Sequence, residues 1–117
     1  MKPNILKEKS FLFAMRIVKL YKYLANEERE FVLSKQLLRR GTSEWVMTRE
    51  ADFAQTKKDF IHKLSIAQKE SNETIYWIEL LMATDYLEEK EYKSIQNDAV
   101  EILKIITSIL KTSKANP

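Results

Sequence analysis

The sequence contains no cysteine, a single glycine (Gly41) and two prolines, Pro3 and Pro117, which lie close to its ends. The absence of cysteine excludes disulfides and thiol chemistry. Turns between strands depend on glycine, proline, asparagine and aspartate, so a chain with so few of the first two is poorly suited to a sheet. The sequence therefore favours long helices.

Histidine is also scarce, because His62 is the only one. Di-metal sites in helical bundles need two Glu-x-x-His pairs, and zinc sites need several histidines or cysteines, so we expect neither a metal nor another cofactor. One glycine cannot build a phosphate-binding loop. We therefore predict that the protein is not an enzyme, and we identify no small-molecule substrate. We interpret His62 as an ordinary surface or boundary residue.

Long apolar runs are missing as well. None approaches the ~20 residues that a membrane span requires, and the segment 1–9 lacks the apolar centre of a signal peptide. We expect a cytoplasmic protein without a membrane partner.

What the sequence does contain suits one domain over residues 1–117, with 44% hydrophobic and 32% charged residues. The net charge is +3 and is unevenly distributed. Residues 1–60 carry 13 basic and 8 acidic side chains, whereas residues 61–117 carry 7 and 9. This asymmetry permits a basic face in the first half of the chain.

Apolar residues recur with helical spacing over about 5–24, 28–54, 57–86 and 90–110. Short polar segments separate these ranges, so the sequence predicts an all-α, antiparallel up-and-down four-helix bundle. Asn26 and Thr56 are predicted to cap the second and third helices. Gly41 marks either a break or a close approach of another helix, and we favour one continuous helix. The tail from Lys111 is predicted to fray.

The predicted inner stripes follow from the same spacing. In chain order they are Phe13, Ile17, Leu20, Tyr21 and Leu24; Phe31, Leu38, Trp45 and Phe53; Phe60, Leu64, Ala67, Ser71, Ile75, Ile78 and Met82; and Ile95, Ala99, Ile102, Ile106 and Ile109.

Three carboxylates gather near the middle of the chain, Glu50, Glu70 and Glu73. Paired carboxylates can perform acid–base chemistry when burial separates their pKa values. We favour a structural interpretation, in which Glu70 and Glu73 pair with Arg40, Arg49 or a lysine and fix the register of two helices.

Basic residues of the second predicted helix form a candidate site for nucleic acid. These are Lys35, Arg39, Arg40 and Arg49, with Arg16, Lys19 and Lys22 of the first helix as weaker candidates. Such a stripe neutralises phosphates and gives sequence-independent affinity that depends on salt. The alternative is a solvated face whose cations pair with nearby acids.

Residues 34–82 carry a recognisable pattern. Its family-pattern residues are Gln36, Gly41, Ser43, Glu50, Phe60, Glu70, Glu73 and Trp77. The segment resembles the bacterial four-helix bundle proteins known as 23S rRNA intervening-sequence proteins. The run Glu44-Trp45-Val46-Met47 departs from the family pattern, which usually has small residues and an asparagine there.

This resemblance implies four antiparallel helices and a homo-oligomer, namely a pentameric ring. It also implies a link to RNA, because some members are encoded inside insertions in large-subunit ribosomal RNA genes. Accessory proteins of diversity-generating retroelements are similar in fold and bind nucleic acid and a reverse transcriptase. Our first hypothesis is therefore an oligomeric bundle that binds RNA or a ribonucleoprotein. The alternative is a structural or protein-interaction scaffold that uses Trp45, Trp77, Tyr76 or Phe53 as anchors.

Overall fold

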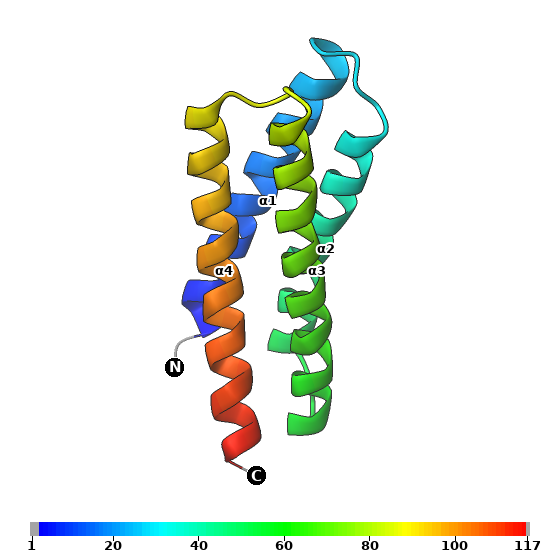
Figure 1. The fold of residues 1–117 in the computed structure, drawn as a ribbon. Helices are drawn as coiled ribbons and strands as arrows, with labels where there is room; N and C mark the ends of the chain where they lie inside the picture. The colour runs from blue at the N-terminus through cyan, green and yellow to red at the C-terminus, as the bar shows by residue number, and fades with distance from the viewer. Residues whose placement is uncertain (1–2, 117) are drawn as a thin grey trace.

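The computed structural model describes residues 3–116, which form four antiparallel helices (Figure 1). These are α1 (Pro3–Asn26), α2 (Leu33–Asp52), α3 (Lys57–Ala83) and α4 (Glu89–Ala115). Consecutive helices pack against each other and α4 returns to α1, with the most extensive contact between α2 and α3. The bundle measures 48 × 21 × 19 Å. The predicted all-α, four-helix class is confirmed.

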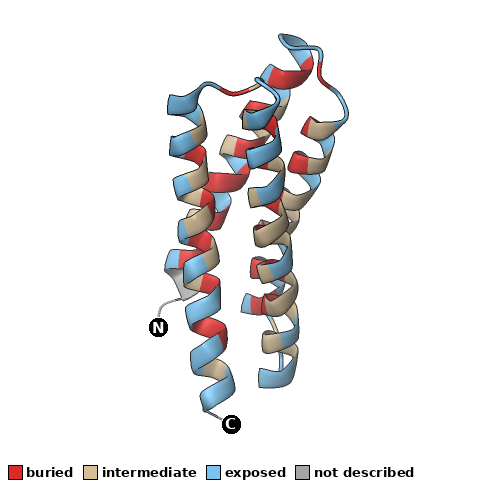
Figure 2. Cartoon of the chain, viewed as in Figure 1, coloured by how far each residue is buried: buried red, intermediate tan, exposed pale blue. Residues whose placement is uncertain are grey.

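Buried residues line the inward sides of the helices, and exposed residues cover the outside (Figure 2). The largest fully buried apolar side chains are Ile17, Leu24, Leu37, Leu64, Ile78, Leu81, Ile95 and Ile106. The stripe predicted for α4 is confirmed, because all five of its residues are buried. In α1 the predicted stripe is also buried except for Tyr21, which is half-buried. In α3 its centre is buried, while Phe60, Ile75 and Met82 pack half-exposed against the core.

The stripe predicted for α2 is wrong. Phe31 and Phe53 are 46% and 73% exposed, and Leu38 and Trp45 are only half-buried. The buried face of α2 instead consists of Ser34, Leu37, Gly41, Glu44, Thr48 and Ala51. Since α2 packs between α1 and α3, small residues on this face let neighbouring backbones come close.

Gly41 shows how close this approach is. A Cβ atom at Gly41 would lie 2.9 Å from Cγ1 and 3.1 Å from Cγ2 of Ile17, which is fully buried in α1. The glycine therefore marks a close helix contact, and the prediction of a continuous helix through it is confirmed.

The start of α2 differs from the prediction, since the helix begins at Leu33 rather than at residue 28. Arg29 has a positive φ of 55°, which interrupts the helix. The carboxylate of Glu30 then accepts hydrogen bonds from the backbone N–H groups of Val32, Leu33 and Ser34 at 3.0, 2.9 and 2.7 Å. The capping role predicted for Asn26 is wrong, because Asn26 lies inside α1.

The other helix ends show one prediction that holds and two that do not. The hydroxyl of Thr56 accepts a hydrogen bond from the backbone N–H of Asp59 at 3.0 Å, which confirms its predicted cap. Helix α3 ends at Ala83 rather than at residue 86, since Asp85 has a positive φ of 70°. The fraying predicted from Lys111 is wrong, because α4 continues to Ala115.

Candidate nucleic-acid interface

Lys35, Arg39 and Arg49 lie on one outer face of α2, here called the basic face. At ~100° per residue they fall within a sector of about 80°, and they span about 21 Å along the helix axis. All three side chains are exposed. Thr42 and Val46 lie between them on the same face, so the face carries no acidic side chain of α2. The prediction that these cations share one surface follows directly from the helical spacing.

The cations of the basic face also lack acidic partners. Within residues 3–116, no ion pair involves Lys35, Arg39 or Arg49. The guanidinium of Arg49 lies over the ring of Trp45, 5.9 Å from its centroid, which orients the cation and leaves its charge unneutralised. Their charges are therefore available to phosphate groups from solution.

Arg40, the fourth predicted residue of this set, faces a different direction. Its Nη1 atom lies 3.0 Å from Glu70 Oε1 and 3.5 Å from Glu73 Oε1, both on α3. The predicted pairing of these glutamates with Arg40 is confirmed. The cluster is half-buried and joins α2 to α3, so Arg40 fixes the register of two helices and is not part of the basic face.

The three candidates of α1 also divide between paired and unpaired cations. Arg16 forms ion pairs of 2.9 Å with both Glu91 and Asp98 of α4. Partial burial would lower the pKa of Arg16, but these hydrogen bonds and charges more than offset it and raise the pKa. Lys19 and Lys22 are exposed and have no acidic partner among the described residues.

A surface patch of apolar side chains lies beside the basic face, at the seam between α1 and α2. The rings of Phe11 and Trp45 are 5.6 Å apart and tilted. Phe11 is 46% exposed, and Met15, one turn further along α1, is 41% exposed. We call Phe11, Met15 and Trp45 the seam patch. Apolar side chains that remain this exposed in one chain are typical of surfaces that bind another protein.

The other aromatic residues predicted as anchors lie elsewhere. Phe53 is 73% exposed just beyond the end of α2, and Tyr76 is 56% exposed on α3. Trp77 is half-buried and packs against the core. These residues are therefore not gathered into one patch with Trp45.

The remaining family-pattern residues have structural contacts. Gln36, Ser43 and Phe60 are half-buried in the helix packing. Glu50 is exposed and forms an ion pair of 3.2 Å with Lys63, which is a second link between α2 and α3.

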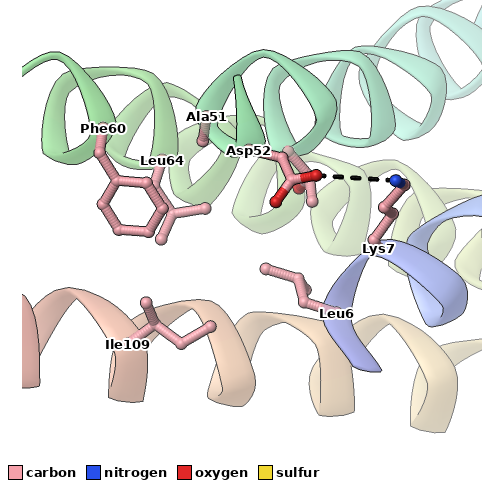
Figure 3. A pocket seen from close by; sticks show the side chains of 8 residues that line it. Leu6, Lys7, Ala51, Asp52, Phe60, Leu64 and Ile109 are labelled. Atoms are coloured by element: carbon pink, nitrogen blue, oxygen red, sulfur yellow. Dashed lines mark ion pairs between the residues drawn. The ribbon is translucent and has the colours of Figure 1, made fainter. Parts of the chain in front are cut away.

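The cavity drawn in Figure 3 is too small for an organic ligand. A cavity of about 10 Å³ lies among the ends of the helices, where Leu6, Ala51, Leu64 and Ile109 surround it and Lys7 pairs with Asp52 at 3.6 Å (Figure 3). This volume holds about one water molecule. Among the described residues, no three acidic or histidine side chains gather as metal ligands, and none of the helices is long and apolar enough to cross a membrane. His62 is exposed, as predicted.

One buried polar cluster was not predicted from the sequence. Glu44 of α2 is 1% exposed, and its Oε2 atom accepts hydrogen bonds from the hydroxyls of Ser10 and Thr48 at 2.6 and 2.8 Å. Burial raises the pKa of Glu44 to about 7, although the two hydrogen bonds lower it in part. The only sequence signal was that Glu44 departs from the family pattern.

Comparisons with known proteins agree with this architecture. A family model described as 23S rRNA-intervening sequence protein matches residues 2–108. A crystal structure from Bacteroides thetaiotaomicron, described as a protein with unknown function from the S23 ribosomal protein family, is 57% identical. The match covers 95% of this chain and 99% of that chain, with a TM-score of 0.93. No curated protein matches the sequence.

Proposed function

Because the chain belongs to the 23S rRNA-intervening sequence protein family, we propose that it is a non-enzymatic, cytoplasmic helical bundle that binds RNA or a ribonucleoprotein through the basic face of α2. The observation that carries this proposal is the set of Lys35, Arg39 and Arg49, three exposed cations within one sector that have no acidic partner in the described chain. Cations already engaged by carboxylates, such as Arg16 and Arg40, would have to exchange partners before binding a phosphate.

The geometry favours binding to the phosphate backbone rather than to particular bases. Three cations on one helix face release about two counterions from a single strand, so the logarithm of the association constant should fall with a slope of about −2 against the logarithm of the salt concentration. Affinity from one such face is weak. Assembly of several subunits would repeat the face and convert the weak contacts into a multivalent site.

The test is the solution mass by light scattering, with and without RNA, at low and high salt. The basic-face variant replaces Lys35, Arg39 and Arg49 with glutamine, and its matched control replaces Lys104, Lys111 and Lys114 of α4. Those lysines are equally exposed, also fall within about 80° of one helix face, and have no acidic partner among the described residues.

We expect the protein to gain mass with RNA only at low salt. The basic-face variant should bind at least tenfold more weakly, while the control, which loses the same charge, should bind within about threefold of the original. If RNA does not bind at low ionic strength, or if both variants lose affinity equally, the proposal is wrong.

The seam patch favours a second candidate function, a scaffold that assembles with copies of itself without binding nucleic acid. The family resemblance makes a homopentamer the expected assembly. Phe11 and Met15 project from one side of α1 next to Trp45, and aromatic side chains are typical anchors of protein interfaces.

A charged substitution in the seam patch tests this assembly. Trp45→Glu should shift the mass toward that of one chain, because an ionised side chain would be buried in the interface. Trp45 is half-buried, so Phe11→Glu is a second variant that perturbs the fold less. An unchanged mass for Phe11→Glu, with helix content retained, would show that the seam patch is not an interface.

A further inference from the structure

The cluster of Ser10, Glu44 and Thr48 joins two helices through one buried carboxyl group. Ser10 and Glu44 are both buried, and their hydrogen bond connects α1 to α2 across 34 residues of sequence. Thr48 lies one turn beyond Glu44 on α2 and donates to the same oxygen. The other carboxyl oxygen, Oε1, is buried and has no hydrogen-bond partner among the described residues.

This environment suits the neutral form of the carboxyl group better than the ionised form. A buried charge is costly unless a cation or several donors stabilise it, and only two neutral hydroxyls contact Glu44. The uncharged acid keeps both hydrogen bonds without burying a charge. The cluster therefore has one favourable state and one unfavourable state, which differ by a single proton.

No other charged group compensates Glu44. Helix α2 packs against α1 and α3 only. The charged groups at this level of the three helices are Lys7, Glu8 and Lys9 on α1, Arg40 and Arg49 on α2, and Lys63, Lys69, Glu70 and Glu73 on α3. Each is exposed or paired elsewhere, and none forms an ion pair with Glu44 in the described chain. Burial alone therefore raises the pKa of Glu44, and the hydrogen bonds from the two hydroxyls offset only part of this rise.

We propose that Ser10, Glu44 and Thr48 form a pH-sensitive latch between α1 and α2, which is closed while Glu44 carries its proton and loosens when Glu44 ionises. Loosening follows because an ionised carboxylate must either admit water or move toward the surface, and both require α1 to separate from α2. Neutral pH lies within the range of this transition, since the pKa of Glu44 is about 7.

The latch lies directly beneath the seam patch. Phe11 follows Ser10 in α1 and Trp45 follows Glu44 in α2, so the aromatic pair of exposed Phe11 and half-buried Trp45 is carried by the same two helix turns as the buried polar pair. Separation of the helices would move the two rings apart. The latch itself does not depend on whether the seam patch mediates assembly.

Urea unfolding near pH 5.5 and pH 8.5 tests the proposal with three proteins: the original, Glu44→Gln and the control Glu79→Gln. Glutamine at 44 keeps the shape and an acceptor for the hydroxyls but cannot ionise. Glu79 is an exposed glutamate of α3 without an ion pair among the described residues.

A folded-state pKa of about 7, against the ordinary 4.5, should raise the unfolding equilibrium constant of the original protein roughly thirtyfold between these pH values. The control should show the same rise, and Glu44→Gln should lack it. Equal pH dependence in the original and Glu44→Gln would overturn the proposal.

A second measurement needs no substitution and remains decisive if Glu44→Gln does not fold. The ¹³C signal of the Glu44 carboxyl group is followed with pH, together with hydrogen exchange of the α1 amides around Ser10. A midpoint near 7, accompanied by faster exchange in α1 after correction for the intrinsic effect of pH, supports the latch. A midpoint near 4.5, or a raised midpoint without a change in α1 exchange, overturns it.

Discussion

Helices α2 and α4 face the core with different chemistry. The inner face of α4 consists of Ile95, Ala99, Ile102, Ile106, Ile109 and Leu110, whereas that of α2 consists of Ser34, Leu37, Gly41, Glu44, Thr48 and Ala51. Burial of branched apolar side chains stabilises the first face. The second face is small and polar, and it lets α2 pack closely between two neighbours. The large and basic side chains of α2 consequently lie outside, where they form the basic face and part of the seam patch.

Two buried carboxyl groups, Glu30 just before α2 and Glu44 in its middle, differ in a similar way. Burial would raise the pKa of Glu30, but three backbone N–H donors outweigh it and lower the pKa, so Glu30 stabilises the fold as an anion. That contribution is present above the ordinary pKa of 4.5 and is lost as the pH falls. Glu44 behaves in the opposite way, because its contribution is lost as the pH rises toward about 7. Together, the two groups make the folded state more stable at mildly acidic pH than above neutrality.

The largest effect should come from the inner face of α4. Ile106 is fully buried, and Ile106→Ala should lower the free energy of unfolding by about 3.5 kcal/mol, through lost burial and the cavity left behind. Urea unfolding measures this change. Ser108→Ala, two residues away and exposed, is the control and should change stability by less than about 0.5 kcal/mol. A loss below about 1 kcal/mol for Ile106→Ala would mean that the isoleucine stripe does not dominate the core.

The next effect concerns the cap of α2. Glu30→Ala should cost about 2 kcal/mol near pH 7, because three backbone N–H groups lose their acceptor. The cost should be smaller near pH 3 than near pH 7, because the pKa of Glu30 is lowered and the stabilisation by its anion is lost as the pH falls. Unfolding at both pH values measures the change, and exposed Glu27→Ala serves as the control. A cost that does not vary with pH would mean that the charge of Glu30 contributes nothing to the cap.

A smaller effect is expected at the contact between α1 and α2. Gly41→Ala gains about 1 kcal/mol of helix propensity but places a methyl group against Ile17, so we expect a net loss of about 1 kcal/mol. Ile17→Ala removes Cγ1 and Cγ2, the two atoms that the new methyl group would approach most closely. In that background Gly41→Ala should be neutral or stabilising, as a double-mutant cycle of unfolding free energies would show. If the effects of the two substitutions on the free energy of unfolding are additive, the methyl group at position 41 is not strained against Ile17, and α1 and α2 move apart without a cost in stability.

The sequence was sufficient to predict the fold class and the inner face of α4, since isoleucine at helical spacing leaves no competing face there. It was insufficient for α2. Hydrophobic periodicity assumes that large apolar residues face inward, but the position of α2 between two close neighbours requires small residues there instead. The start of α2 was misplaced for a related reason, because the capping group is a glutamate that precedes the helix by three residues.

The candidate site was predictable in part. Helical spacing places Lys35, Arg39 and Arg49 on one face. The sequence left open whether Arg40, Arg49 or a lysine pairs with Glu70 and Glu73, and the structure shows that Arg40 does. The latch was not predictable. A buried glutamate is uncommon, and its hydroxyl partner Ser10 comes from a different helix, so no local pattern connects the two residues.

The smallest expected effect concerns the exposed aromatic side chain just beyond the end of α2. Phe53 is 73% exposed, so Phe53→Ser should change the free energy of unfolding by less than about 0.5 kcal/mol. Leu37→Ala, on the buried face of α2, is the matched comparison and should cost about 3 kcal/mol. Both values come from urea unfolding at one pH and at a protein concentration where the mass is that of one chain.

If Phe53→Ser costs more than about 2 kcal/mol, the aromatic stripe predicted from periodicity would be the inner face after all. If instead the cost appears only at concentrations where the chains associate, Phe53 is covered by a second copy, and the outer face of α2 is part of the assembly.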